Sequence, residues 1–322
     1  MRRLLLLALV VVGLAPGTFL RTLTDARGAA AVVTITPRPE RAGVSGELAL
    51  TGVWELRSAQ AHFGGFSTLA HGAGQALVAG SDRSFLLDID LAGGIPRAVP
   101  GSFRWVGIST RGRKEFVDLE SLARDPASGT LWAGFEAQNL IVRYAPDGRR
   151  TIAAPPAMAE WGRNSGAETM ERLADGRFLV IAEGVVAGSD WFHEALLFPG
   201  DPVAGAAPAR STFKAPPGYD PVDAAQLPDG RVLILLRAVR YRLPAEFDTM
   251  IAIADPREMR PGKVWEARIV ERLNGGIFAD NFEGITFVPS AQDPAKGSIW
   301  LVVDDNFSVF QRSLLVRFDS PR

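Results

Sequence analysis

The residues best suited to chemistry in this chain are carboxylates that recur beside short apolar runs. The stretch "DNFEGITFVPSAQDPAKGSIWLVVDDNFS", which begins at Asp280, has one acidic cluster before an apolar run and another after the next run. The chain has no cysteine and three histidines, which excludes thiolate nucleophiles, disulfides and cysteine-ligated metals. If a metal binds, this composition therefore favours oxygen ligation of a hard cation such as Ca²⁺.

The acidic positions belong to a repeat of about fifty residues. Five segments share it, beginning at positions separated by 53, 48, 55 and 60 residues: "STLAHGAGQALVAGSD" from Ser67, "ESLARDPASGTLWAGFE" from Glu120, "ETMERLADGRFLVIAEG" from Glu168, "DAAQLPDGRVLILLR" from Asp223 and "EGITFVPSAQDPAKGSIWLVVDD" from Glu283. In each, a turn rich in Asp, Gly or Pro separates two short apolar runs, which is typical of a β-hairpin.

Further strand-like segments follow the hairpins, at residues 140–146, 195–200, 250–256 and 313–319, with outer strands expected at 151–155, 211–216 and 267–273. Four antiparallel strands per unit at this period predict an all-β fold, a single β-propeller. We count five blades and leave a sixth open, built from residues 31–57 or 91–115. Residues 48–58, "LALTGVWELRS", are expected to close the ring as an N-terminal strand on the last blade.

In an antiparallel hairpin the start of the first strand faces the end of the second, so two positions per unit should meet at one mouth of the channel. These positions are Ser67, Glu120, Glu168, Asp223, Glu283, Asp82, Glu136, Glu183, Arg237 and Asp304 (or Asp305). Eight of the ten are carboxylates, which cannot all ionise at close range without compensation. Protonation, a bound cation or neighbouring arginines could supply it. Alternatively, single acids could accept bonds from backbone amides or protect a sheet edge.

The first residues, "MRRLLLLALVVVGLAPG", predict an export signal, because two arginines precede an apolar run too short to span a bilayer comfortably. A short membrane anchor is the alternative. We divide the chain into a signal peptide with linker, 1–31, and a propeller domain, 32–322. We expect a periplasmic or secreted monomer without stable membrane insertion. A net charge of −1 gives no reason to expect a nucleic-acid partner.

Several motifs resemble the family of phytase-like proteins with esterase-like activity, which are exported bacterial proteins. They are "DLESLARDP", "NSGAETMERLADGRFLVIAEG", "LPDGRVLILLR" and the closing pair "DNFEGITFVP" and "WLVVDDNFS", followed by Arg312. The resemblance implies a β-propeller that hydrolyses phosphate or other esters with Ca²⁺. The family's polar positions fall here on Asp118, Glu120, Asn164, Glu168, Glu183, Asp223, Asp280, Asn281, Glu283, Asp304, Asp305 and Asn306, with Arg113 or Lys114 upstream.

Two functions follow as hypotheses. The first is Ca²⁺-assisted hydrolysis of a phosphate or carboxylate ester, a small molecule rather than phytate, because an acidic mouth repels a highly phosphorylated substrate. The second is a non-catalytic propeller that binds a ligand or partner, with Ca²⁺ as a structural clip. For the first, we predict the following roles: catalytic residues Glu183 and Glu283; substrate-binding residues Lys114, Arg163, Arg237 and Asn164; metal ligands Glu120, Glu168, Asp223, Asp280, Asp304 and Asp305.

Overall fold

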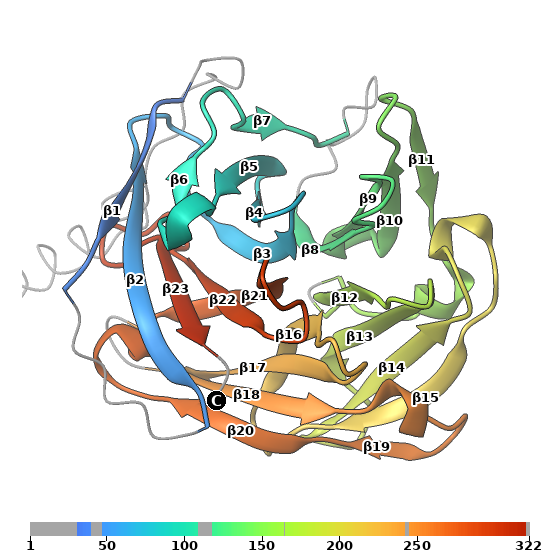
Figure 1. Cartoon of the computed structure of the whole chain (residues 1–322). Helices are drawn as coiled ribbons and strands as arrows, with labels where there is room; N and C mark the ends of the chain where they lie inside the picture. The colour runs from blue at the N-terminus through green and yellow to red at the C-terminus, as the bar shows by residue number, and fades with distance from the viewer. Residues whose placement is uncertain (1–30, 40–46, 109–117, 164, 242–244, 320–322) are drawn as a thin grey trace, which may run out of the picture.

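The computed structural model describes residues 31–39, 47–108, 118–163, 165–241 and 245–319. These residues form 23 strands and six short 3₁₀ helices, arranged as five sheets around a common axis (Figure 1). None of the helices in these ranges is long and apolar enough to cross a bilayer. Apart from Ala31, the predicted signal segment lies outside the described residues.

Each sheet is one blade, and its first three strands follow the chain outward from the axis. Blade 1 has β3 (Phe66–His71), β4 (Ala76–Ser81), β5 (Phe85–Asp90) and β6 (Arg97–Ala98), and β7 (Arg104–Trp105) also pairs with β5. Blade 2 has β8 (Leu119–Arg124), β9 (Leu131–Phe135), β10 (Leu140–Tyr144) and β11 (Arg150–Ala153). Blade 3 has β12 (Thr169–Arg172), β13 (Phe178–Val185), β14 (Phe192–Phe198), β15 (Ala209–Lys214) and β19 (Val264–Glu266).

Blade 4 has β16 (Asp220–Gln226), β17 (Val232–Arg240), β18 (Glu246–Ala254) and β20 (Arg268–Leu273). Blade 5 joins β1 (Val33–Pro37) and β2 (Ala49–Ser58) to β23 (Leu314–Asp319), β22 (Gly297–Asp304) and β21 (Asn281–Pro289). The 3₁₀ helices are η1 (Ala92–Gly94), η2 (Glu136–Gln138), η3 (Pro156–Met158), η4 (Pro202–Ala204), η5 (Pro256–Glu258) and η6 (Gly276–Ala279). Every strand expected from the sequence is therefore confirmed, within a few residues at its ends.

The ring has five blades, because β3, β8, β12, β16 and β21 form the innermost strands and each contacts the next, with β21 returning to β3. The two segments considered for a sixth blade extend existing ones instead. The described part of residues 91–115 contributes β6 and β7 to blade 1, and the described part of residues 31–57 contributes β1 and most of β2 to blade 5. Residues 40–46 and 109–115 lie outside the described residues.

The predicted closing strand is confirmed. β2 pairs antiparallel with β23, with Trp54 opposite Leu315, so the beginning and the end of the propeller lie in one sheet (Figure 1). Trp54 also packs on Trp300 of β22, with ring centroids 5.4 Å apart. Closure of this kind joins the first and last parts of the ring by strand pairing and aromatic packing.

The core consists of five hydrophobic clusters, and each lies between two adjacent blades. The sequence of strand β17, "VLILLRAVR", is almost continuously apolar because the strand is buried on both faces. Leu233 and Leu235 pack toward blade 5, whereas Ile234 and Leu236 pack toward blade 3. A strand buried on both faces needs apolar residues at every position. The run is interrupted by Arg237, where the strand reaches the mouth.

Candidate functional site

The hairpin register brings the predicted positions to one face of the propeller. In blade 5, Asn281 at the start of β21 lies opposite Asp304 at the end of β22. In blade 4, Asp220 lies opposite Arg237. The other three inner hairpins run in the same sense, so inner strands begin and second strands end at this face. We call the carboxylates gathered there the acidic mouth: Asp82, Asp118, Glu120, Glu136, Glu168, Glu183, Glu283 and Asp304.

Arg237 is the cation at the centre of the mouth's hydrogen-bond network. Its guanidinium donates to a carboxylate oxygen of Glu283, to Asn281 Oδ1 at 3.1 Å and to Glu183 Oε1 at 2.8 Å. Asn281 Nδ2 donates in turn to Glu283 Oε1 at 2.7 Å and to Asp304 Oδ2 at 3.3 Å. Arg237 therefore orients carboxylates from blades 3 and 5 at once, as its planar, forked group allows.

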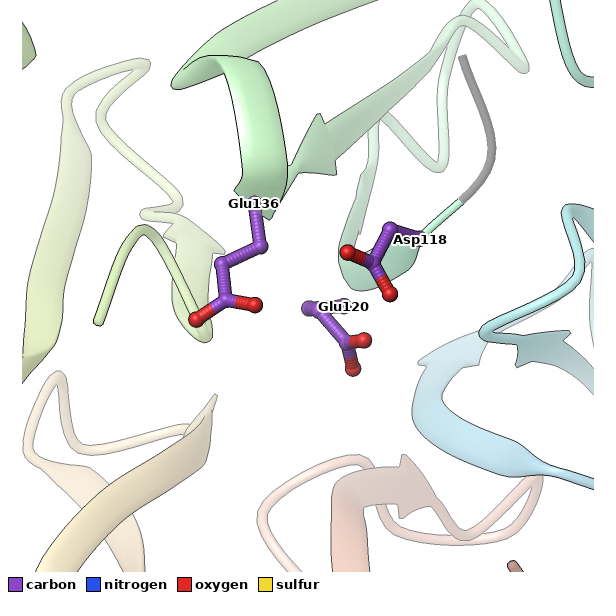
Figure 2. A group of neighbouring side chains, drawn as sticks. All are labelled: Asp118, Glu120 and Glu136. Atoms are coloured by element: carbon purple, nitrogen blue, oxygen red, sulfur yellow. The ribbon is translucent and has the colours of Figure 1, made fainter. Parts of the chain in front are cut away.

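Two overlapping groups of carboxylates lie beside this network. Asp118, Glu120 and Glu136 of blade 2 each offer an oxygen within 4.8 Å of the others, and Figure 2 shows the three side chains around a shared space. Glu136, Glu168 and Glu183 form a second group by the same measure. Glu136 belongs to both groups and is itself buried, so it links blade 2 to blade 3.

Burial and mutual repulsion raise the pKa values of these acids. Desolvation is the main cause for Glu120, whose pKa lies well above its ordinary value, and Glu168 and Glu283 add repulsion. The pKa of Glu168 is also raised, first by desolvation and then by repulsion from Glu183, although the positive charge of Arg237 opposes both effects. Desolvation raises the pKa of Glu136 to about 7 and that of Asp82 to about 7. The mouth thus holds more negative charge than Arg237 neutralises, so it favours protons or a cation.

The backbone around Glu136 is tightly packed. Gly166 N donates to Glu136 Oε1 at 3.2 Å, and the Gly166 carbonyl accepts bonds from the amides of Glu168 and Glu183, both at 3.0 Å. A Cβ atom at Gly166 would lie 2.8 Å from Glu136 Cγ, so only glycine permits this approach. Asp118 adopts a φ of 88°, which is unusual for a residue with a side chain and costs about 1–3 kcal/mol. The close packing at Gly166 restricts the position of the Glu136 side chain.

Asp223 forms bonds between blades instead. Its side chain accepts hydrogen bonds from Ile285 N of blade 5 and from Ala224 N, both at 2.8 Å, and it is 1 % exposed. Ser67 has a comparable position, because its hydroxyl donates to the carbonyl of Leu119 in blade 2 at 2.6 Å. These bonds satisfy backbone groups between inner strands, which is the structural alternative for an acid in this position.

Asp305 ties the chain after β22 to blade 1. One carboxylate oxygen accepts from Gly65 N and from Phe307 N, both at 3.0 Å, and the other accepts from the Ser313 hydroxyl at 2.7 Å. Asp280 receives a bond from Arg312 at 3.0 Å. Of the six predicted metal ligands, Glu120 and Glu168 thus lie in the carboxylate groups, and Asp304 joins the Asn281 network.

The predicted substrate-binding residues have different positions. Arg163 is exposed, in the segment before β12. Arg237 is held by two carboxylates and Asn281. Lys114 and Asn164 lie outside the described residues. Of the predicted substrate-binding residues that the structure describes, the one within the mouth, Arg237, is therefore already paired with carboxylates.

The donor set of the two carboxylate groups fits a hard divalent cation. It consists of carboxylate oxygens from blades 2 and 3, without His or Cys, and Ca²⁺ takes six to eight oxygen ligands. Asp118 and Glu136 were not among the six predicted ligands. Both occupied marked positions in the sequence, Glu136 as the end of a second strand and Asp118 through the family resemblance, but only the fold shows how close they lie.

The chain was compared with curated proteins, solved structures and family models. No curated protein matches the chain. Solved structures that align over most of it include a nidogen/laminin complex (10 % identity, covering 88 % of this chain and 96 % of that one, TM-score 0.43) and virginiamycin B lyase from Staphylococcus aureus with quinupristin (12 %, 88 % and 99 %, TM-score 0.42). Another is the β-propeller domain of Cps50 (Swd1) from Myceliophteria thermophila (11 %, 89 % and 99 %, TM-score 0.40). These likenesses carry nothing about function.

A family model described as phytase-like, "esterase-like activity of phytase", matches residues 61–307. The match extends from the approach to β3 through to the loop after β22, so it includes the whole inner ring and every carboxylate of the acidic mouth. The chain therefore belongs to the phytase-like family, whose name points to a hydrolase-like function.

Proposed function

We propose that this protein hydrolyses a small phosphate or carboxylate ester at the acidic mouth with the help of Ca²⁺. The observation that carries the proposal is the pair of overlapping carboxylate groups joined by Glu136, with oxygens within 4.8 Å, in a chain of a family described as esterase-like. Such a cluster of buried acids is costly unless a cation or protons compensate it. In metal-assisted hydrolysis, the negative charge of these carboxylates would bind the catalytic cation.

The cation would be held by Asp118, Glu120 and Glu136, with Glu168 beside Glu136 as a further ligand. Ca²⁺ bound there would supply a Lewis acid for the carbonyl or phosphoryl oxygen of the ester. Asp223 and Asp305 are left out of the set, because backbone amides and the Ser313 hydroxyl already occupy their oxygens. Asp280 and Asp304 remain candidates for an outer role.

Glu183 is the proposed general base. Burial raises its pKa, and the bond from Arg237 fixes its orientation. Glu183 would take a proton from water as the water oxygen bonds to the carbonyl carbon or phosphorus. It would return that proton to the alkoxide that leaves as the ester bond breaks. Glu283 becomes a positioning residue in this scheme, since its carboxylate holds Arg237 and Asn281.

The test is hydrolysis of p-nitrophenyl acetate and p-nitrophenyl phosphate by the chelated protein as Ca²⁺ is titrated. We expect activity to depend on Ca²⁺, Glu168→Gln to weaken that dependence, and Glu183→Gln to lower the rate while Ca²⁺ still binds. Asp147→Asn, at an exposed turn on the opposite face, is the matched control. Hydrolysis by Glu183→Gln at the wild-type rate would show that Glu183 is not the general base.

The second candidate is a non-catalytic binding propeller with a structural cation. It is favoured by Arg237, whose bonds to blades 3 and 5 already link the mouth without a substrate. Ca²⁺ binding by calorimetry, with no hydrolysis of either ester, would support it. Export to the periplasm or medium and a monomeric state remain predictions under both candidates.

A further inference from the structure

A histidine is buried beside the backbone of the proposed base. His193 belongs to β14 and lies opposite Val185, which is two residues beyond Glu183 on the neighbouring strand β13. The side chain of His193 is fully buried, and neither ring nitrogen has a hydrogen-bond partner among the described residues. A buried polar group without a partner is unfavourable, so packing alone does not explain a histidine at this position.

The ring lies between blades 3 and 4 and faces hydrogen-bond acceptors. Ala195, two residues along β14 and on the same side of the strand, packs in the hydrophobic cluster between these blades. Asp220 Oδ1, at the start of β16 in blade 4, is 4.0 Å from His193 Nε2, which is too far for a hydrogen bond. Backbone carbonyls of residues 182–184 and of Tyr219 also lie beside the ring. The surroundings therefore suit a protonated ring, whose two nitrogens are both donors.

Burial and these acceptors act on the ring in opposite directions. Desolvation lowers the pKa of His193, whereas the neighbouring carbonyls raise it. The elements packed against the ring carry three titratable side chains, Glu183 on β13, Tyr219 before β16 and Asp220 on β16, while β15 presents the uncharged Phe213. Of the three, Glu183 bonds to the mouth's arginine, and Asp220 is the one whose carboxylate approaches the ring.

Asp220 connects this histidine with the proposed base. It lies opposite Arg237 in the inner hairpin of blade 4, and its side chain is 40 % exposed. Desolvation raises the pKa of Asp220, and Arg237 opposes that effect. Desolvation also raises the pKa of Glu183 against the effect of Arg237, and the negative charge of Asp220 raises it further. The charge of one carboxylate therefore acts on both the buried imidazole and the proposed base.

Protonation of the ring would change both interactions. An imidazolium donates from both nitrogens, so Nε2 would bond to Asp220 after an approach of about 1 Å. The positive charge of the ring would then offset the negative charge of Asp220, and the repulsion that Asp220 exerts on Glu183 would fall. Glu183 would consequently remain ionised, and able to accept a proton from water, at a lower pH than it would without the histidine.

We propose that His193 and Asp220 form a proton-dependent clamp between blades 3 and 4 that keeps Glu183 ionised as the medium becomes acidic. His193 is a positioning residue in this arrangement, because it acts on Glu183 through Asp220 and not on the substrate. The effect on catalysis rests on the proposed hydrolysis with Glu183 as the base. The bond between His193 and Asp220 is a property of the folded chain and can be observed without any substrate.

Histidine NMR of the full chain tests the clamp, because the chain has only three histidines. The signals are assigned by replacing each histidine with glutamine in turn, so His193 is identified even if its own variant does not fold. In Asp220→Asn, the pKa read from the His193 signal should fall by at least about one unit, because the neighbouring negative charge no longer favours the protonated ring.

Asp190→Asn is the matched control for this titration. It removes the same charge from an exposed position three residues before His193, where solvent screens it, and should shift the His193 signal much less. Equal shifts in Asp190→Asn and Asp220→Asn would overturn the clamp. So would a His193 signal that does not titrate between pH 4 and 8, or one that is unchanged in Asp220→Asn.

The pH dependence of kcat/KM for p-nitrophenyl acetate, with Ca²⁺ present, tests the effect on Glu183. Asp220→Asn should move the acid limb of the profile to lower pH by about half a unit or more, because the charge that repels Glu183 is gone. His193→Gln should move the limb to higher pH, because Asp220 then keeps its charge. A histidine that only fills space would change stability and leave the acid limb in place, and Asp190→Asn should leave it as in the wild type.

The two measurements separate the clamp from the proposed hydrolysis. If no ester is hydrolysed but the His193 signal depends on Asp220, the clamp stands and the proposed hydrolysis fails. If esters are hydrolysed and the His193 signal does not depend on Asp220, the clamp fails and the hydrolysis stands. If the signal depends on Asp220 but the acid limb moves in neither variant, or moves in the same direction in both, the proposed effect on Glu183 is overturned.

Discussion

The two faces of the propeller use the same residue types in opposite ways. At the face opposite the mouth, turns carry an aspartate two residues before an arginine: Asp147 with Arg149, Asp175 with Arg177, Asp229 with Arg231 and Asp255 with Arg257. The bonded arginine lowers the pKa of each of these aspartates. Each charge therefore has a partner from its own turn and stays in water.

At the mouth, the partners come from other blades and water is largely excluded. Glu183 of blade 3 and Glu283 of blade 5 share Arg237 of blade 4, and burial raises the pKa values of both glutamates. The difference shows that the setting of a carboxylate, rather than its type, determines whether it is a solvated turn cap or part of a site. The following predictions test that difference, from the largest expected effect to the smallest.

Loss of the proposed base should have the largest effect. Glu183→Gln should lower kcat for p-nitrophenyl esters by about 10²–10⁴-fold, because the amide cannot accept the proton of water. The fall should be in kcat rather than in the Ca²⁺ dissociation constant, as steady-state kinetics and calorimetry would show. A fall of the same size in Asp175→Asn on the opposite face would argue for a general loss of folding.

Removal of the mouth's arginine should strongly destabilise the fold. Arg237→Met leaves Glu183 and Glu283 buried without their shared partner, at a cost of about 3–5 kcal/mol in the free energy of unfolding. Urea denaturation at pH 7 measures this change. The loss should be smaller at pH 5, where the two glutamates can take up protons; an equal loss at both values would mean that packing, not charge, is responsible.

Added cation should stabilise the folded protein. At a concentration one hundred times its dissociation constant, Ca²⁺ should raise the free energy of unfolding by about 2.7 kcal/mol, visible as a higher Tm after chelation and repletion. Glu136→Gln and Glu168→Gln should reduce the rise. No change in Tm with Ca²⁺, Mg²⁺ or Mn²⁺ would mean that protons and Arg237, and not a bound cation, compensate the negative charge of the acids.

The chelated protein should become less stable as the pH rises. In the folded state the pKa values of Asp82 and Glu136 are each about 7, above their ordinary values near 4, so the folded state binds more protons. The stabilisation from protonation is complete below pH 4 and is lost through pH 7, at up to about 1.4 kcal/mol per pH unit for each group. Glu136→Gln should flatten this slope in denaturation series from pH 5 to 8.

Substitutions at the face opposite the mouth should have the smallest effect on stability. Asp229→Asn removes one exposed pair and should change the free energy of unfolding by less than about 1 kcal/mol, and less still in high salt. Thermal unfolding at low and high salt measures it. An effect as large as that of Arg237→Met would contradict the distinction between the two faces.

Much of the fold could be predicted because its signals are local. Turns such as "PDG" before Arg231 and the apolar run of β17 follow from residues that are neighbours in the chain. Even the closing strand was predictable, since residues 48–58 form a strand pattern left over before the first repeat. The count of five blades is confirmed, but the sequence left a sixth open, because an extra strand pair can join an existing sheet, as β1 and β2 do, or begin a new one.

By itself, the sequence determined that every inner hairpin has an acid at the start of its first strand, at the end of its second strand, or at both, since strand periodicity and turn position place them there. Tertiary structure alone decided what each acid does. Asp223 meets the amide of Ile285, 62 residues away, and so holds two blades together, whereas Glu136 meets Glu168 and Glu183 and becomes the centre of the site. The physical reason is that a carboxylate's pKa and partners depend on groups within a few ångströms, and in this propeller many of these groups come from distant parts of the chain or from other blades.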